Sequence, residues 1–222
     1  MSIAIAIDGP AGAGKSTIAK TAAKELGFIY VDTGALYRSV GLFVSNKGID
    51  KTDKEGIIKA LDEIDVKLSF NDKGEQIVIL NGEDVSSLIR TPEISMYASS
   101  VSAIPEVRTF LLDLQRNMAK TNNVIMDGRD IGTVILPDAQ VKIFLSASPE
   151  CRAKRRYDEL IEKGENVTFE EVLKDAIERD YNDSHRATAP LKPADDAIMV
   201  DTTGETLEES VQKLISIMKE KL

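Results

Sequence analysis

Two acidic residues and one basic residue lie within four positions of the chain, in the segment Asp127-Gly-Arg-Asp130. The apolar run at 124–126 precedes them and predicts a short buried strand that ends at Asp127. Charged groups at the end of a buried strand are costly unless they are paired or bind a ligand. The segment therefore predicts a loop that binds a polar or charged ligand.

A second segment, Gly9-Pro-Ala-Gly-Ala-Gly-Lys-Ser16, matches the phosphate-binding pattern G-x-x-x-x-G-K-[ST]. It follows a predicted strand and opens a predicted helix, which is the context that this pattern requires. Its glycines allow backbone N–H groups to point at phosphate oxygens, and the helix N-terminus favours anions. We expect Lys15 to reach the β- and γ-phosphates of ATP and Ser16 to bind Mg²⁺. The expected ATP-binding residues are Gly9, Pro10, Ala11, Gly12, Ala13, Gly14, Lys15, Ser16 and Thr17.

A phosphate-binding loop is shared by GTPase switches, ATPase motors and small-molecule kinases, so other segments must separate these classes. Asn46-Lys-Gly-Ile-Asp50 resembles the guanine-binding N-K-x-D, but its aspartate comes one residue late. Asp53-Lys-Glu-Gly56 spells D-x-x-G, but no apolar strand precedes it and it follows the N-K segment, which is the wrong order. We interpret both as polar loops, which disfavours a GTPase. A motor would need a larger chain or an oligomer interface.

The segment Asp32-Thr-Gly-Ala-Leu-Tyr-Arg38 follows the second predicted strand and supplies a candidate acceptor site. Ligands of such folds bind at the carboxyl ends of parallel strands, where this segment begins. Arg38 lies about one helical turn into the next predicted helix and can bind a phosphate through two hydrogen bonds. An exposed helical arginine is the alternative. Thr33 is a candidate helix N-cap as well as a ligand contact, and the two roles are compatible.

Further arginines follow downstream, each able to contribute roughly 1.5–3 kcal/mol through a hydrogen bond to phosphate. Those at 152–156 stand at helical spacing from the acids at 158 and 159, so part of this group can be an exposed face. The net charge of 28 − 37 = −9 makes an anionic ligand the better explanation for so many arginines near loops and helix ends. They are Arg108, Arg129, Arg152, Arg155, Arg156, Arg179 and Arg186.

Hydrophobic periodicity predicts strands that alternate with helices. The expected strands are 2–7, 28–31, 66–70, 76–80, 124–126, 141–145 and 198–200. The expected helices are 16–26, 35–45, 92–103, 105–120, 149–163, 169–182 and 206–221. Turn signals at Asn71-Asp72-Lys73-Gly74 and Asn81-Gly82 mark 62–91 as a small antiparallel insertion. The alternation elsewhere predicts an α/β fold with a parallel sheet and helices on both faces.

Composition and hydropathy argue against several classes of protein. A negative net charge disfavours binding of a nucleic acid polymer, and the sequence has no apolar run of 18 residues that could span a membrane. The first residues, MSIAIAIDG, lack the basic flank of a signal peptide. The single cysteine, Cys151, is expected to be an ordinary helical residue and fits a cytoplasmic location, and a zinc site is disfavoured. Without a coiled-coil pattern, we expect a monomer.

The chain resembles the bacterial cytidylate kinase (CMP kinase) family almost from end to end. The resemblance rests on IDGPAGAGKST, DTGALYRSVG, GRDIGTVILPDA, VKIFL, RDYNDSHRATAPL and the predicted insertion. GRDIGTV followed by PDA, and R-x-x-APL after an Arg-Asp helix end, are more specific than a phosphate-binding loop. One difference is mild: the family's acceptor loop often reads D-S-G, and Thr33 here keeps the hydroxyl.

The resemblance implies a P-loop nucleoside-monophosphate-kinase fold with a five-stranded parallel sheet. It implies a core at 1–61, 92–149 and 166–222, a nucleoside monophosphate (NMP)-binding insertion at 62–91 and a lid at 150–165. The implied reaction transfers the γ-phosphoryl group of ATP to CMP or dCMP, with Mg²⁺ as cofactor, and gives ADP with CDP or dCDP.

The resemblance also assigns site residues. Cytosine would be contacted by Ser99, Arg108 and Asp130, and a carboxylate can accept from the amine that distinguishes cytosine from uracil. The metal-binding residues would be Ser16 and Asp127. The implied catalytic residues are Lys15, Arg155, Arg156, Arg179 and Arg186. The implied CMP-binding residues are Thr33, Arg38, Ser99, Arg108, Arg129, Asp130, Arg179, Asp183 and Arg186.

The acceptor phosphate of such a reaction has a second pKa near ~6 and is already largely ionised at neutral pH, so no general base is needed. We therefore interpret His185 as a loop residue. Two alternatives remain for the function: another small P-loop kinase that acts on UMP, AMP or a non-nucleotide acceptor, or a P-loop regulatory protein that does not transfer phosphate. For Asp130 the alternative is a loop cap that binds nothing.

Overall fold

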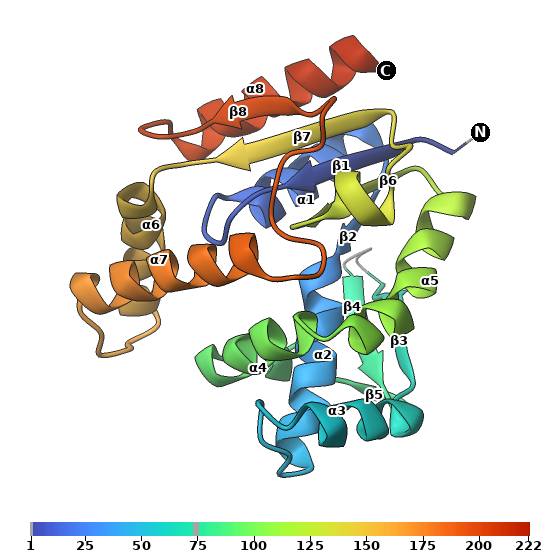
Figure 1. Cartoon of the computed structure of the whole chain (residues 1–222). Helices are drawn as coiled ribbons and strands as arrows, with labels where there is room; N and C mark the ends of the chain where they lie inside the picture. The colour runs from blue at the N-terminus through green and yellow to red at the C-terminus, as the bar shows by residue number, and fades with distance from the viewer. Residues whose placement is uncertain (1, 73–75) are drawn as a thin grey trace. The chain divides into compact units, whose positions relative to one another are not determined.

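The computed structural model describes residues 2–72 and 76–222, which divide into two compact units. The P-loop unit comprises Met1–Tyr30 and Asn122–Leu222, and the inserted unit comprises Val31–Thr121. Figure 1 shows the elements of both units along the chain. The compact unit in the middle of the chain is thus longer than the insertion at 62–91 that turn signals mark.

The P-loop unit is built on the predicted parallel sheet, which the structure confirms. The five strands lie in the order β2, β6, β1, β7 and β8. Their bounds are Ile29–Asp32, Val124–Gly128, Ala4–Asp8, Val141–Ser146 and Ile198–Asp201, respectively. β1 pairs in parallel with β6, so that Ile7 lies opposite Asp127 and Asp8 lies opposite Gly128. This register brings the start of the phosphate-binding loop and the segment 127–130 to the same edge of the sheet.

Helices α1 (Lys15–Leu26) and α8 (Leu207–Lys221) pack against this sheet. Their apolar stripes join the inward side chains of β1, β6, β7 and β8 in one buried cluster. α1 ends where Gly27 adopts a left-handed conformation and donates its N–H to the carbonyl of Ala23. α8 begins with a capping box between Thr206 and Glu209. The helical stripe predicted at 16–26 is therefore confirmed as a core-facing surface.

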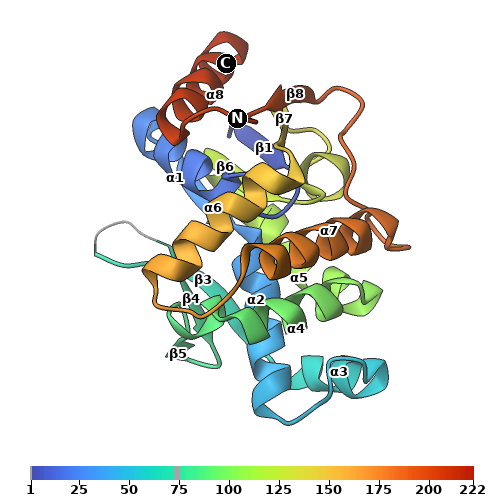
Figure 2. The same cartoon turned by 90° about the vertical axis from the view of Figure 1, so that its left-hand side faces the viewer.

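Helices α6 (Pro149–Glu162) and α7 (Phe169–His185) lie side by side, as Figure 2 shows. They share a small apolar core around Ala153, Leu160 and Val172. The predicted capping box at Thr168-x-x-Glu171 is present at the start of α7. Cys151 is a free helical residue of α6, as expected. The segment 150–165 is thus a helix and the turn after it.

The inserted unit contains helices packed around a three-stranded antiparallel sheet. Its helices are α2 (Thr33–Asn46), α3 (Lys54–Ala60), α4 (Pro92–Ser102) and α5 (Pro105–Thr121). The sheet consists of β3 (Val66–Phe70), β4 (Gln76–Leu80) and β5 (Glu83–Asp84). Both predicted strands have the predicted bounds, and Asn81-Gly82 forms the predicted turn with Asn81 at φ 49°. The turn predicted at 71–74 includes Lys73 and Gly74, which lie outside the described residues.

Several local predictions are wrong for identifiable reasons. Asp53-Lys-Glu-Gly56, interpreted as a polar loop, opens α3, because the Asp53 carboxylate accepts the N–H of Gly56 and caps the helix. Asp32 rather than Thr33 caps α2, since Thr33 is already the first helical residue. His185 is not a loop residue but the last residue of α7, where its ring stacks on Tyr181. The π-helix η3 (Ile131–Ile135) was not predicted either.

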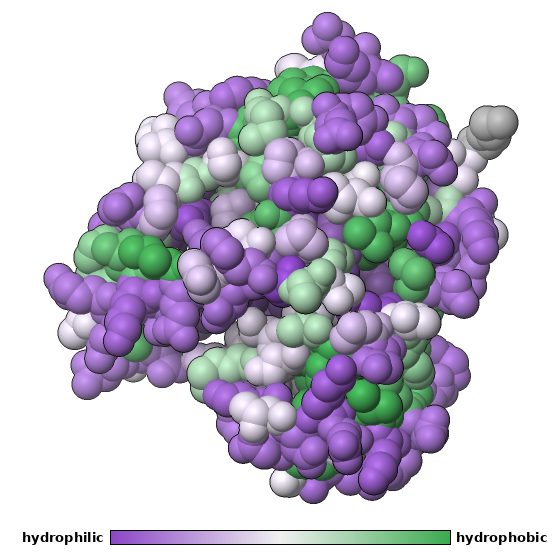
Figure 3. Space-filling model, viewed as in Figure 1, coloured by the Kyte–Doolittle hydropathy of each residue, from purple (hydrophilic) through white to green (hydrophobic). Residues whose placement is uncertain are grey.

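The surface is predominantly hydrophilic on the face shown in Figure 3, where hydrophobic residues lie in small groups. This agrees with a content of charged residues of 29%. None of the helices in the part of the chain that the structure describes has the length and hydropathy needed to cross a bilayer.

Candidate active site

The phosphate-binding loop leaves β1 at Gly9 and reaches α1 at Gly14. A Cβ atom at Gly9 would lie 2.0 Å from the carbonyl oxygen of Leu145, so only glycine lets the loop pass β7. A Cβ atom at Gly12 would lie 3.2 Å from the Cβ atom of Arg152, and Gly12 has φ 75°, which favours glycine. Gly14 occupies the N-cap of α1 and has no side chain to cap it. The first amides of α1 are therefore available to an anionic ligand.

Lys15 lies inside this loop. It is buried, and its Nζ donates a hydrogen bond to the carbonyl of Pro10 at 2.7 Å. Burial lowers the pKa of Lys15 well below its ordinary value, and the positive charge of Arg129 lowers it further. The charges of Asp127 and Asp8 oppose this shift. Lys15 and the segment after β6 are thus close enough to act on one charged group.

Ser16 and Asp127 form the candidate metal site. The Ser16 hydroxyl donates to Asp127 Oδ2 at 2.8 Å, and the hydroxyl of Tyr30 donates to Oδ1 at 3.0 Å. A hydroxyl and a carboxylate are hard oxygen ligands of the kind that Mg²⁺ prefers alongside substrate phosphates and waters. Across residues 2–72 and 76–222 no group of three His, Cys, Asp or Glu could hold a metal ion. Ser16 and Asp127 together are a candidate pair of metal ligands.

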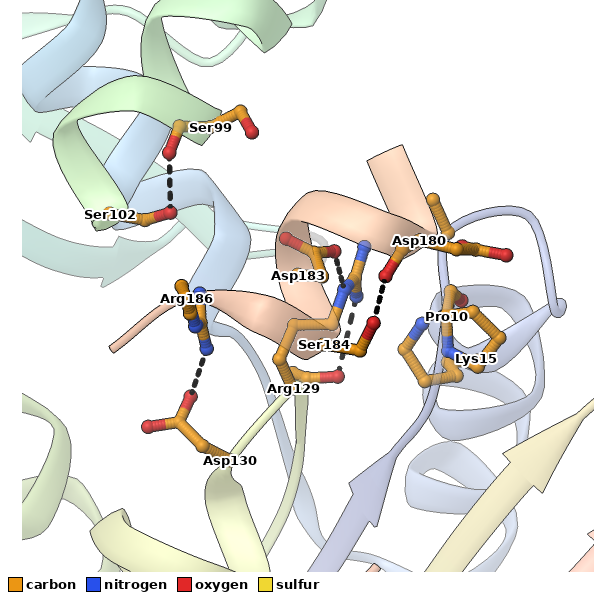
Figure 4. A network of polar contacts seen from close by, with 12 residues as sticks. Pro10, Lys15, Ser99, Ser102, Arg129, Asp130, Asp180, Asp183, Ser184 and Arg186 are labelled. Carbon is orange, nitrogen blue, oxygen red and sulfur yellow. Dashed lines mark hydrogen bonds and ion pairs between the residues drawn. The ribbon is translucent and has the colours of Figure 1, made fainter. Parts of the chain in front are cut away.

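Arg129 and Asp130 project from the end of β6 toward the end of α7, as Figure 4 shows. Arg129 Nε donates to Asp183 Oδ2 at 2.9 Å, and Arg186 Nη2 lies 3.6 Å from Asp130 Oδ1. The two acids are buried. Burial by itself would raise the pKa of Asp183, but the nearby charges of Arg129, Arg179 and Arg186 outweigh it, so the pKa is lowered. Three predicted arginines thus converge on one buried carboxylate.

Arg179 also belongs to this cluster, since its positive charge contributes to the lowered pKa of both Lys15 and Asp183. Within the P-loop unit the structure therefore brings together Lys15, Arg129, Arg179 and Asp183. Positive charges of this density around a buried lysine are suited to phosphate groups carrying several negative charges.

Asp8 is a residue of this site that the sequence analysis did not single out. It is buried at the end of β1, and its two carboxylate oxygens accept the N–H groups of Ile131 and Gly132 at 2.7 and 2.8 Å. Burial raises its pKa to about 6, and the charge of Asp130 acts in the same direction. The signal in the sequence is a polar residue, Asp8, at the end of an apolar strand. It directly precedes the glycine-rich motif, which by itself explains a loop at this place.

The three arginines of α6 have different environments. Arg152 is buried and donates to the carbonyls of Ala147 and Ala11 and, through both Nη atoms, to the Asp180 carboxylate. Arg155 donates to the carbonyls of Thr202 and Glu205, and a Cβ atom at Gly14 would lie 4.0 Å from its Nη1.

Arg156 forms an exposed ion pair with Glu159 at 2.8 Å, which fits the expected solvent-exposed face. The arginines predicted at 152–156 are therefore not equivalent. Arg152 and Arg155 both lie beside the phosphate-binding loop, at Ala11 and Gly14 respectively. Arg152, one of the downstream arginines but not among the implied catalytic or CMP-binding residues, holds that loop through the carbonyl of Ala11.

Replacing Arg152 with alanine is expected to lower the free energy of unfolding by about 3 kcal/mol or more, because the substitution leaves Asp180 and two carbonyls without their buried donor. Lys154→Ala is the matched control on the same helix, since it removes an exposed ion pair with Asp158 and should cost less than about 1 kcal/mol. Urea denaturation of both variants measures the difference. Equal stabilities of the two variants would contradict the assigned role of Arg152.

The inserted unit holds the remaining predicted residues. The Arg38 guanidinium pairs with the Asp32 carboxylate at 2.7 Å, and Arg90 lies 3.9 Å from the same oxygen. The Nε atom of Arg38 is buried and makes no hydrogen bond within the described chain. Thr33 is buried beside them at the start of α2. Two guanidinium groups thus converge near the predicted acceptor segment, and Arg90 was missed because it is about fifty residues away in sequence.

Arg108 and Ser99 also lie in the inserted unit. Arg108 is buried, donates to the carbonyl of Ser102 at 3.1 Å and has its guanidinium 5.5 Å from the ring centroid of Tyr37. Ser99 is half-buried on α4, and its carbonyl accepts a hydrogen bond from the Ser102 hydroxyl. The structure therefore connects Arg108 with α4 through Ser102, within one unit.

Comparison with known proteins identifies the family of this chain. A sequence model of the family described as cytidylate kinase matches residues 5–220. Cytidylate kinases from Caldicellulosiruptor saccharolyticus and Carboxydothermus hydrogenoformans are 53% and 51% identical, over 97% and 98% of this chain and 95% and 97% of theirs. A crystal structure of an uncharacterized protein from Eubacterium ventriosum, 14% identical, shares the fold with a TM-score of 0.55 over 99% of both chains. The chain belongs to the cytidylate kinase family.

Proposed function

We propose that this protein transfers the γ-phosphoryl group of ATP to CMP or dCMP and so forms ADP with CDP or dCDP. The membership of the cytidylate kinase family gives the reaction class. One structural observation carries the assignment: the strand register of β1 and β6 places Arg129 and Asp130 at the same sheet edge as the phosphate-binding loop that holds Lys15. A donor site and an acceptor site at one edge are what direct transfer between two nucleotides requires.

On the ATP side, we assign phosphate binding to the segment Gly9–Thr17. The first amides of α1 would surround the phosphates, while Lys15 would move from the Pro10 carbonyl to the β- and γ-phosphates. Arg155 stands beside Gly14 and is the better candidate of the two predicted lid arginines for contact with the transferring group. Arg156 is the second candidate, and it would have to break its ion pair with Glu159 to contact the transferring group.

On the acceptor side, we propose that arginines bind the monophosphate and that other polar side chains contact the base. Arg38 and Arg90, which converge near Asp32 in the inserted unit, are proposed to bind the phosphate. Arg129 of the P-loop unit is proposed as a phosphate contact in its own right. Asp130 is proposed to accept a hydrogen bond from the exocyclic amine of cytosine. The remaining proposed contacts are Thr33, Ser99, Arg108, Arg179, Asp183 and Arg186.

Catalysis needs no proton-transfer residue in this scheme. The acceptor is a phosphate oxygen that is already ionised near neutral pH, with a pKa near ~6. The chain's own contribution is to orient the two phosphates in line and to neutralise the negative charge that develops between them, through Lys15, Arg129 and Arg179. Their closeness is supported by the charges of Arg129 and Arg179, which both lower the pKa of Lys15 and that of Asp183.

Mg²⁺ is proposed as the cofactor, held by Ser16 and Asp127 together with the nucleotide phosphates. When bound, it would neutralise charge on the phosphate oxygens. Removal of divalent cations with EDTA is expected to abolish turnover and added Mg²⁺ to restore it. Asp127→Ala should raise the Mg²⁺ concentration needed for half-maximal activity by roughly 10-fold or more. Full activity in EDTA would contradict this proposal.

The substrate assignment is tested by measuring ADP release in a coupled assay with CMP, dCMP, UMP and AMP as acceptors. A clear preference for CMP or dCMP supports the proposal. A preference for UMP or AMP would identify another small P-loop kinase, and ATP binding without acceptor-dependent ADP release would identify a regulatory protein. We also propose that the enzyme is cytoplasmic and acts as a monomer. Its elution volume in gel filtration tests the monomeric state.

A further inference from the structure

The carboxylate of Asp8 joins two distant parts of the chain. Asp8 ends β1, and the next residue, Gly9, begins the phosphate-binding loop. Its Oδ1 accepts the N–H of Ile131 at 2.7 Å and its Oδ2 accepts the N–H of Gly132 at 2.8 Å, across 123 and 124 residues of sequence. These amides follow directly after Arg129 and Asp130. One side chain therefore connects the strand of the ATP site to the loop proposed to bind CMP.

The two amides that Asp8 binds lie at the N-terminus of a helical turn. Ile131 and Gly132 are the first two residues of the π-helix η3, and Asp130 occupies its N-cap position. An aspartate at an N-cap ordinarily uses its own carboxylate to accept an amide of the first turn. Asp130 makes no such capping bond. Asp8, on the neighbouring strand, accepts the N–H groups of Ile131 and Gly132 instead. The Asp130 carboxylate is therefore not used for capping and lies toward Arg186.

The segment after Asp130 forms a single turn of π-helix, which is rare in proteins. Asp8 contacts this turn through both of its carboxylate oxygens. The space is also closed: a Cβ atom at Gly132 would lie 3.4 Å from Asp8 Oδ2 and 3.2 Å from Cδ of Lys142. An asparagine at position 8 would replace one of the two acceptor oxygens with an NH2 donor, which would face an amide N–H and could not accept from it.

We propose that Asp8 is a positioning residue for base recognition: it caps η3 from β1 and thereby holds the Asp130 carboxylate in position for a pyrimidine ring. This inference rests on the proposed function, because it assumes that Asp130 contacts the base. It adds that a residue adjoining the ATP loop determines selectivity for the acceptor.

Asp8→Asn is the direct test, measured as kcat and KM for both substrates. We expect KM for CMP to rise by roughly 10-fold and the preference for CMP over UMP to fall. KM for ATP should rise by a clearly smaller factor, since the charge of Asp8 also acts on Lys15. Asp201→Asn is the matched control, since Asp201 ends the parallel strand β8 and its carboxylate accepts the N–H of Thr203 in its own loop. An equal rise of KM for ATP and CMP would overturn the proposal.

A double-mutant cycle separates this role from general structural support. If Asp8 acts through Asp130, Asp8→Asn should add little further loss of CMP use when Asp130 is already alanine. Fully additive losses would contradict the inference. A wild-type enzyme that does not phosphorylate CMP would instead refute the proposed function itself.

Amide hydrogen exchange of the wild-type protein gives a measurement that does not depend on any variant folding. The amides of Ile131 and Gly132 should be strongly protected, because both donate to a buried carboxylate. Exchange as fast as that of exposed loop amides would overturn the proposal.

Discussion

Lys15→Ala is expected to lower kcat/KM by roughly 10³-fold or more, with the fold intact. The side chain is buried within the phosphate-binding loop, and its amine is the positive group of that loop that can follow charge onto the transferring phosphoryl group. Steady-state assays with saturating CMP measure the loss. Turnover within 10-fold of wild type would contradict the assigned role.

The same substitution should not destabilise the protein. Burial and the charge of Arg129 both disfavour the protonated amine in the folded chain, so its removal is expected to leave Tm unchanged or raise it. Lys24→Ala is the matched control, because Lys24 lies exposed in the last turn of the same helix. It should preserve both activity and Tm. A large loss of Tm in Lys15→Ala would mean that the lost activity reports unfolding.

Asp130→Ala is expected to raise KM for CMP by roughly 10²-fold, with KM for ATP changed little. The carboxylate is buried, and it is proposed to accept from the amine that uracil lacks. Preference for CMP over UMP should therefore fall in the same variant. Initial rates over a matrix of CMP, UMP and ATP concentrations measure all three quantities.

The control for Asp130 is Asp138→Ala, in the exposed segment that follows η3. It removes the same charge eight residues away and should leave selectivity unchanged. Because Arg186 lies 3.6 Å from Asp130, Asp130→Asn serves as a second variant that keeps the shape of the side chain. If CMP use is as efficient in both Asp130 variants as in wild type, Asp130 does not contact the base.

Patterns with local causes were predictable from the sequence. β3 and β4 have the bounds expected from alternation and turn residues, and the capping box at Thr168 begins α7 as expected. The phosphate-binding loop was recognisable because its glycines and lysine stand at fixed spacing in a strand–loop–helix context. In each case the residues that determine the conformation lie within a few positions of each other.

Features that depend on distant partners were not predictable in the same way. η3 is stabilised by Asp8, more than 120 residues before it, and no local propensity marks a π-helix at 131–135. The sequence assigns Arg152 no role apart from helical spacing, and only the fold shows that it donates to the carbonyl of Ala11. Arg90 becomes a candidate site residue only because the fold places it near Asp32, which precedes it by 58 residues. Site residues were thus found by type and motif, and their partners by structure.

The central claim is that Lys15 and the Arg129–Asp130 segment hold two nucleotides for direct transfer. A crystal structure with CMP, ADP and aluminium fluoride, a mimic of the transferring phosphoryl group, tests it most directly. We predict Asp130 within hydrogen-bond distance of the cytosine amine, with Lys15 and Arg129 in contact with the fluoride group. Cytosine bound elsewhere, with Asp130 still turned to Arg186 and Arg129 away from the fluoride group, would contradict the account.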